Sequence, residues 1–237
     1  MSIRRNVDRE LVAVRSLLLR MADLVEEQFA NAVDALFRRD LDAAAAVHRR
    51  DDEVDALELE VDHFCERVLA LHHPVADELR ILLTAIKINT DLERIGDHCK
   101  NVAKNVPHVA EAPEALAATR LREMSDAARA LFRDVYDAFV TRDAAAARAV
   151  LARDEQVDRL HRENFDALVA HARQHPEQVA AVAHLLTAGK DVERVADHVA
   201  NIAESVIFLL EGLDVRHGGA PSSPAETASS GDGAPRR

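Results

Sequence analysis

The sequence has few of the residues that β-rich proteins and nucleic-acid-binding surfaces use. It contains no tryptophan, and aromatic residues make up 3% of its 237 residues. This scarcity argues against base-stacking surfaces and against most β-sandwiches, which are rich in aromatic and β-branched residues. The chain also has only seven glycines and seven prolines. A β-rich protein of this size would need more turn-forming residues.

Cysteine and long apolar runs are scarce as well, and the 30 lysines and arginines are outnumbered by 42 acids. The net charge is −12, which excludes the non-specific nucleic-acid binding that depends on cations against phosphates. The two cysteines, Cys65 and Cys99, are not spaced as a metal or redox pair, and we expect both to be free core residues. No segment reaches the roughly 18 apolar residues of a membrane span, and the first residues lack a signal-peptide pattern. We therefore expect a cytoplasmic protein.

What the chain does contain is helical periodicity. Apolar residues recur every seven positions through the second apolar segment, at Val47, Val54, Val61 and Val68. This spacing predicts one long helix over residues 41–71. A similar stripe follows at Ile81, Ile88, Ile95 and Val102. Polar or proline-containing breaks at 39–40, 72–74 and 107–113 separate the segments, and such short connections predict antiparallel neighbours.

The chain also repeats itself. An offset of 103 residues pairs Val47 with Val150 and Val54 with Val157, and the offset is 100 where the segment from Asp91 matches the segment from Asp191. Each repeat contains three predicted helices. We therefore predict an all-α protein of six long antiparallel helices, arranged as two tandem three-helix bundles over residues 1–110 and 111–212. Residues 213–237, rich in glycine, serine and proline, are predicted to form a flexible tail.

Pairs of acidic residues spaced four apart occur in the second and third helix of each repeat. This spacing places both carboxylates of a pair on one helix face. The residues are Asp51, Asp55, Glu93 and Asp97 in the first repeat, and Asp154, Asp158, Glu193 and Asp197 in the second. Like charges at this spacing repel, so the pairs must face water, meet a basic partner or hold a cation. Carboxylate oxygens favour cations such as magnesium, manganese or iron.

Two interpretations of these acids stay open at this point, a metal site and a solvated face. Recurrence in both repeats beside the same Arg-x-x-Asp-His sequence favours the metal site for the third-helix acids, whereas the second-helix aspartates fit both equally. Asn89 and Asn101 extend the first acidic row as possible oxygen donors, and Asn201 extends the second. Glycine at 189 stands where the first repeat has Asn89, so the two sites can differ.

The residues beside the acids have simpler expected roles. His98 and His198 point away from the acidic stripe and are expected to be hydrogen-bonded structural residues. Arg94 and Arg194 are expected to form ion pairs with nearby aspartates. Glu60 and His63 have the Glu-x-x-His spacing of di-iron bundles, but the second repeat has no counterpart, so we assign them to the surface.

The segments TDLERIGDHCKNVAKNV and KDVERVADHVANIAESV resemble the signature of the PhoU family of phosphate-transport accessory proteins. The resemblance covers roughly residues 7–212. It implies two three-helix bundles that often form a homodimer, and metal ions (iron, manganese, zinc or magnesium) held by the eight acids named above. It further implies a protein without enzymatic turnover that negatively regulates the phosphate-starvation response.

The resemblance also implies partners, namely the ATPase subunit of the phosphate ABC transporter and a phosphate-sensing histidine kinase. Contact with the membrane would then be peripheral and only through these partners. Two alternatives remain beside this hypothesis. One is a di-metal carboxylate oxidase or ferroxidase, against which the missing second Glu-x-x-His argues. The other is a metal-free helical scaffold whose acids are solvated.

Overall fold

Six long helices dominate the computed structural model, which describes residues 2–215. They are α1 (Ser2–Arg38), α2 (Leu41–His72), α3 (Asp77–Lys104), α6 (Leu121–Thr141), α7 (Ala144–Gln174) and α8 (Val179–Glu211). Two short helices, α4 (Val106–Val109) and α5 (Pro113–Ala117), and one 3-10 turn, η1 (Pro176–Gln178), lie in the connections. The described part of the chain is helical with no strand, which confirms the all-α prediction.

The helix boundaries follow from local chemistry. Asp40 caps α2, because its carboxylate accepts a hydrogen bond from the Ala43 amide at 2.9 Å. Asp143 caps α7 in the same way, accepting from the amides of residues 145 and 146. The residue before each cap, Arg39 or Arg142, has a left-handed backbone with φ of 57° or 58°. The predicted break at residues 39–40 is therefore a sharp turn that recurs in the second repeat.

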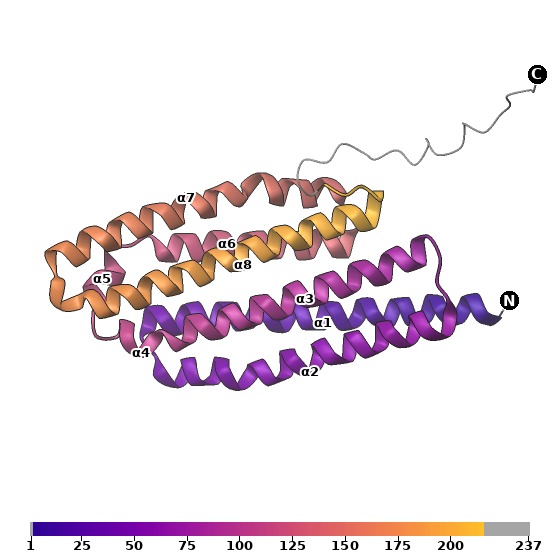
Figure 1. Cartoon of the computed structure of the whole chain (residues 1–237), viewed down its shortest axis with the longest axis horizontal. Coiled ribbons are helices and arrows are strands. Elements are labelled where there is room, and N and C mark those ends of the chain that lie inside the picture. Colours follow the sequence, from indigo (N-terminus) through magenta and orange to yellow (C-terminus); the bar gives the residue numbers. More distant parts are fainter. Residues whose placement is uncertain (1, 216–237) are drawn as a thin grey trace, which may run out of the picture.

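The helices form two bundles that lie side by side along their length (Figure 1). Helices α1, α2 and α3 pack together as bundle one, and α6, α7 and α8 pack together as bundle two. The bundles meet through α3 against α8 and α1 against α6, which leaves α2 and α7 on the two outer sides (Figure 1). The repeat detected in the sequence is thus also a repeat in space.

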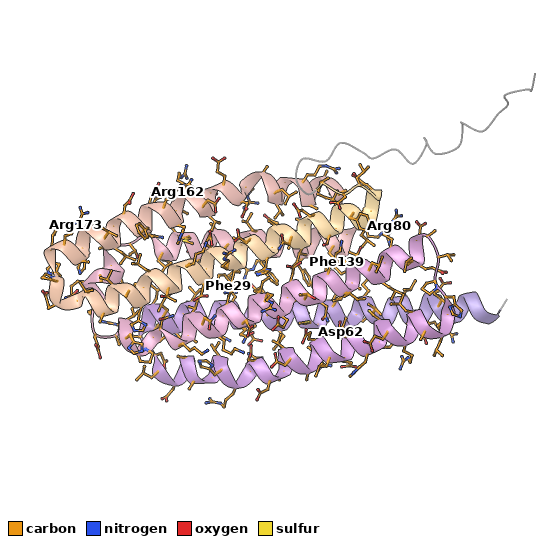
Figure 2. The ribbon with its side chains drawn as sticks, in the orientation of Figure 1. Phe29, Asp62, Arg80, Phe139, Arg162 and Arg173 are labelled. Atoms are coloured by element: carbon orange, nitrogen blue, oxygen red, sulfur yellow. The ribbon has the colours of Figure 1, made fainter. Side chains whose placement is uncertain are left out.

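The predicted apolar stripes form the core. Val47, Val54, Val61 and Val68 are all at most 2% exposed. Buried residues of both bundles belong to one continuous hydrophobic cluster rather than to two. Figure 2 shows Phe29 of α1, which is 1% exposed, near the middle of the molecule, whereas Arg162 and Arg173 of α7 lie at its outer side. The two bundles therefore share a core.

Several sequence expectations can be compared with this fold. The helix expected over residues 41–71 is α2, which ends one residue later. The break expected at 107–113 is more ordered than predicted, since α4 and α5 lie at its two ends. Both cysteines are buried and free, as expected. Within residues 2–215 no helix is both long and apolar enough to cross a bilayer. The predicted flexible tail lies, beyond Val215, outside the described residues.

Candidate metal centre

The eight predicted acids gather into two groups, one in each bundle. Cluster one comprises Asp51 and Asp55 on α2 with Glu93 and Asp97 on α3. Cluster two comprises Asp154 and Asp158 on α7 with Glu193 and Asp197 on α8. In each bundle the second and third helices pack against each other, and this contact brings their two pairs of acids together. The structure shows the two clusters in different surroundings.

Cluster one contains a positively charged side chain. The Lys100 ammonium contacts Oδ2 of Asp51, and it lies 2.9 Å from Oδ1 of Asp97. The side chain of Asp51 is only 5% exposed, and its Oδ1 accepts a hydrogen bond of 3.1 Å from Nε2 of the buried Gln28. Asp51 is therefore enclosed, and both of its oxygens have protein partners. Asp55, by contrast, is exposed.

The pKa values in cluster one follow from this arrangement. Burial alone would raise the pKa of Asp97, but the hydrogen bond and charge of Lys100 outweigh burial and lower it. Burial would likewise lower the pKa of Lys100, yet its hydrogen bonds to Asp51 and Asp97 raise it. The pKa of Glu93, which Lys100 does not contact, is raised by burial and by the charge of Asp97. The ammonium thus neutralises the inner part of the cluster.

Cluster two brings three of its carboxylates together. Asp158, Glu193 and Asp197 each place a ligand atom within 4.8 Å of the others. Two oxygens bound on opposite sides of a calcium ion are about 4.8 Å apart, and about 4.2 Å apart across magnesium. Small side-chain adjustments would therefore let these three oxygens contact one divalent cation. The donor set, carboxylates alone, fits a hard or intermediate metal ion.

Burial and repulsion between its carboxylates raise two pKa values in cluster two. Burial and the charges of Asp158, Asp197 and Glu193 raise the pKa of Asp154 to about 6. The pKa of Asp197 is raised as well, by burial and by Glu193, in contrast to its counterpart Asp97. A bound cation would reverse both effects, because it stabilises the ionised carboxylates.

Two basic side chains lie at the edge of cluster two. Lys190 contacts Glu193, and Arg194 lies 3.2 Å from Asp197. Their side chains are 46% and 52% exposed, so both are surface ion pairs of the kind that contributes little and can move aside. Arg94 pairs with Glu93 and Asp97 in the same way, at 3.4 and 3.9 Å. The ion-pair role expected for the two arginines is confirmed.

The asparagines expected to extend the acidic rows have other contacts. Asn89 donates from Nδ2 to the carbonyl oxygen of Glu58 at 3.1 Å and to Asp62 at 2.9 Å, which fixes it to α2. Oδ1 of Asn101 accepts from Lys104, and the backbone carbonyl of Asn101 accepts from the side chain of Asn105. Glu60 and His63 are exposed, as the surface assignment predicts.

The histidines beside the acids join the two bundles. Nδ1 of His98 lies 2.9 Å from Oδ1 of Asp191, and Nδ1 of His198 lies 2.9 Å from Oδ1 of Asp91. Asn201 also donates to Asp91, at 3.2 Å. The pairs are reciprocal across the contact of α3 with α8, where the two imidazole rings are 5.6 Å apart. The expected structural role of both histidines is confirmed.

The partners in these contacts are not among the residues predicted from the sequence. An aspartate precedes each histidine by seven residues, which is two helical turns on one face, and this recurring pattern marks Asp91 and Asp191 as candidates. Lys100 had a weaker signal, since it lies one turn beyond Asp97 in one repeat only. Gln28 had none, because its partner lies on another helix.

Comparison with known proteins matches both repeats. The family model for the PhoU domain matches residues 18–106 and again 121–206. The phosphate-specific transport system accessory protein PhoU homolog of Pseudomonas putida is 36% identical over 225 residues, which cover 94% of this chain and 88% of that protein. The homolog of the same name from Caulobacter vibrioides is 35% identical, covering 89% of this chain and 92% of its own.

Solved structures agree with this match. The crystal structure of PhoU from Pseudomonas aeruginosa superposes with a TM-score of 0.83 at 34% identity, covering 87% of this chain and 99% of that one. The phosphate transport system regulatory protein PhoU from Streptococcus pneumoniae gives a TM-score of 0.80 at 27% identity, covering 88% and 99%. With the repeated helices, the paired acids and these matches in agreement, the chain belongs to the PhoU family.

Proposed function

We propose that this protein is a metal-binding adaptor that negatively regulates the phosphate-starvation response and modulates phosphate uptake. The observation that carries the proposal is the match of both repeats to the PhoU domain, together with relatives named as accessory proteins of phosphate-specific transport. The fold supports an adaptor, because it offers long helical faces for partners around one shared core. The protein acts by binding and not by turnover.

The partners in this proposal are the ATPase subunit of the phosphate ABC transporter and a phosphate-sensing histidine kinase. A net charge of −12 favours encounter with basic partner surfaces and disfavours direct binding to anionic lipid. The protein would therefore reach the cytoplasmic side of the membrane through its partners. Self-association as a homodimer would duplicate these surfaces.

Metal binding is the chemical part of the proposal. Asp158, Glu193 and Asp197 would hold a divalent or multinuclear centre of iron, manganese, zinc or magnesium. Asp154 lies near these acids, and their negative charges act on its carboxylate. When bound, the ion would supply positive charge between α7 and α8, where Lys190 and Arg194 pair with the acids only from the edge of the cluster. It would bridge α7 and α8 and so fix the outer face of bundle two for a partner.

The direct test is a clean deletion of the gene with a phosphate-starvation reporter, measured in high-phosphate medium. We expect the reporter to be expressed at starvation levels in the deletion strain, because the repressing signal is lost. Re-expression of the wild-type protein should restore repression. Normal repression in the deletion strain would contradict the regulatory role.

A second arm of the same experiment tests the metal. A variant with Asp158→Asn, Glu193→Gln and Asp197→Asn keeps the shape of cluster two but lacks its charge. We expect this variant to accumulate normally and to fail in repression. The matched control is Glu155→Gln, an exposed acid on the same helix as Asp158. Full repression by the triple variant would separate regulation from metal binding.

A further inference from the structure

Two positions beside the acids distinguish the two clusters. Lys100 of α3 corresponds to Ala200 of α8 at the offset of 100 that aligns these helices. Gln28, which contacts Asp51, corresponds to Leu131 at the offset of 103. The two repeats therefore keep the same acids but differ in the two side chains that contact the acids of cluster one. This difference has a chemical consequence for metal binding.

In cluster one the ammonium of Lys100 lies where the second and third helices face each other. It bridges Oδ2 of Asp51 on α2 and Oδ1 of Asp97 on α3. Gln28 holds the other oxygen of Asp51 at 3.1 Å. The Lys100 side chain is 25% exposed, so it is partly enclosed with its partners. A metal ion entering here would have to displace the ammonium from two carboxylates and would be repelled by it.

In cluster two neither of these side chains is available. Ala200 has no polar group, and Leu131 is 2% exposed within the apolar core. The nearest lysine, Lys190, contacts Glu193 only and from a position that is 46% exposed. The carboxylates on α7 and α8 thus face each other without a bridging ammonium. The oxygens of Asp158, Glu193 and Asp197 remain within reach of one ion.

We propose that Lys100 is a built-in cation of cluster one, and that this protein takes divalent metal at cluster two alone. An ammonium supplies one positive charge and three donors, enough to bridge Asp51 and Asp97 without a metal. The inference rests on the proposed function in so far as cluster two binds metal. It departs from the expectation that Asp51, Asp55, Glu93 and Asp97 are ligands as well.

The test counts metal retained by the full-length protein. Each variant is stripped with chelator, loaded with Mn²⁺, desalted and analysed for manganese per chain, and circular dichroism checks that it is helical. Wild-type protein should retain manganese, Asp97→Asn should retain the same amount, and the triple variant of cluster two should retain none. Lys100→Ala should roughly double the retained amount, since it opens a second carboxylate site.

The repeat provides a matched control at the equivalent position. Ala200→Lys should place an ammonium in cluster two and abolish retention. The double variant Lys100→Ala with Ala200→Lys should retain manganese at cluster one. Adding Asp97→Asn to this double variant should then abolish retention. Should Lys100→Ala fail to fold, Asp97→Asn and Ala200→Lys in the otherwise wild-type chain still decide between the two clusters.

The outcomes separate this inference from the proposed function. If the single variant Asp97→Asn loses manganese that the wild type retains, the inference is overturned, but metal binding in the proposed function stands. Retention in Lys100→Ala but not in wild type would support the role of Lys100, but it would contradict metal binding at cluster two, both in this inference and in the proposed function. No retention in any variant would overturn both.

Discussion

The carboxyl group of Asp154 lies among three other acids, whereas its counterpart Asp51 contacts an amide and an ammonium. Burial and these neighbours raise the pKa of Asp154 to about 6. Between roughly pH 4 and 6, the folded protein therefore keeps a proton on Asp154, whereas the unfolded chain has released it. In metal-free protein the contribution of Asp154 to the free energy of unfolding should be larger at the acidic end of this range, because folded-state protonation there removes repulsion.

This effect predicts a pH-dependent contribution to stability that substitution of Asp154 removes. In chelator, the free energy of unfolding attributable to Asp154 should fall as pH rises from 4 to 6 and stay low above it. Asp154→Asn should abolish that fall and stabilise the apo-protein at pH 7 by about 1–2 kcal/mol. Urea denaturation at pH 4.5 and 7.5 measures this. Asp166→Asn, an exposed change on the same helix, is the control. Equal pH dependence in both variants would contradict the assignment.

Residue types and spacing single out eight acids, which the fold gathers into two groups, but they do not tell the two clusters apart. The spacing of four identifies a shared face within one helix. It carries no information about which side chain from a neighbouring helix fills the space, and Gln28 reaches Asp51 from another helix. Lys100 is visible in the sequence only as one more surface charge. Its burial against Asp51 and Asp97 needed the structure.

Among the helices, the repeated turn before α2 and α7 shows how a short motif sets a boundary. Asp143 accepts two amide hydrogen bonds at the start of α7. We predict that Asp143→Ala destabilises the protein by about 1 kcal/mol, since those amides lose their partner. Thermal or urea denaturation measures the change. Asp143→Asn, which retains the accepting oxygen, should cost much less. An equal loss in both variants would place the effect elsewhere.

The long helices could be located from sequence, and their partners could not. Seven-residue periodicity and the polar breaks gave α2 to within one residue of its observed end. The short helices α4 and α5 are missing from the prediction because one helical turn has no periodicity to detect. Amphipathic spacing identifies a buried face but not what covers it. The contact of α3 with α8, which joins the bundles, therefore came only from the structure.

For the whole molecule, the reciprocal histidine–aspartate pairs predict a measurable coupling between the bundles. A double-mutant cycle on His98→Ala and Asp191→Ala should give a coupling free energy of about 1 kcal/mol, because the two side chains are in direct contact. The cycle on His198 and Asp91 should give a similar value. A mixed cycle on His98→Ala and Asp91→Ala is the control, and a comparable coupling there would contradict specific pairing.

These reciprocal pairs have the form of an isologous contact, in which a residue of one half meets its partner on the other and the reverse also holds. In a symmetric dimer of a single three-helix unit, every substitution would occur twice. Here the two halves are covalently joined, so a substitution changes one half alone. Lys100 without a lysine at position 200 is such a change. Fusion of the halves keeps the symmetric contact and at the same time allows the two acidic clusters to diverge.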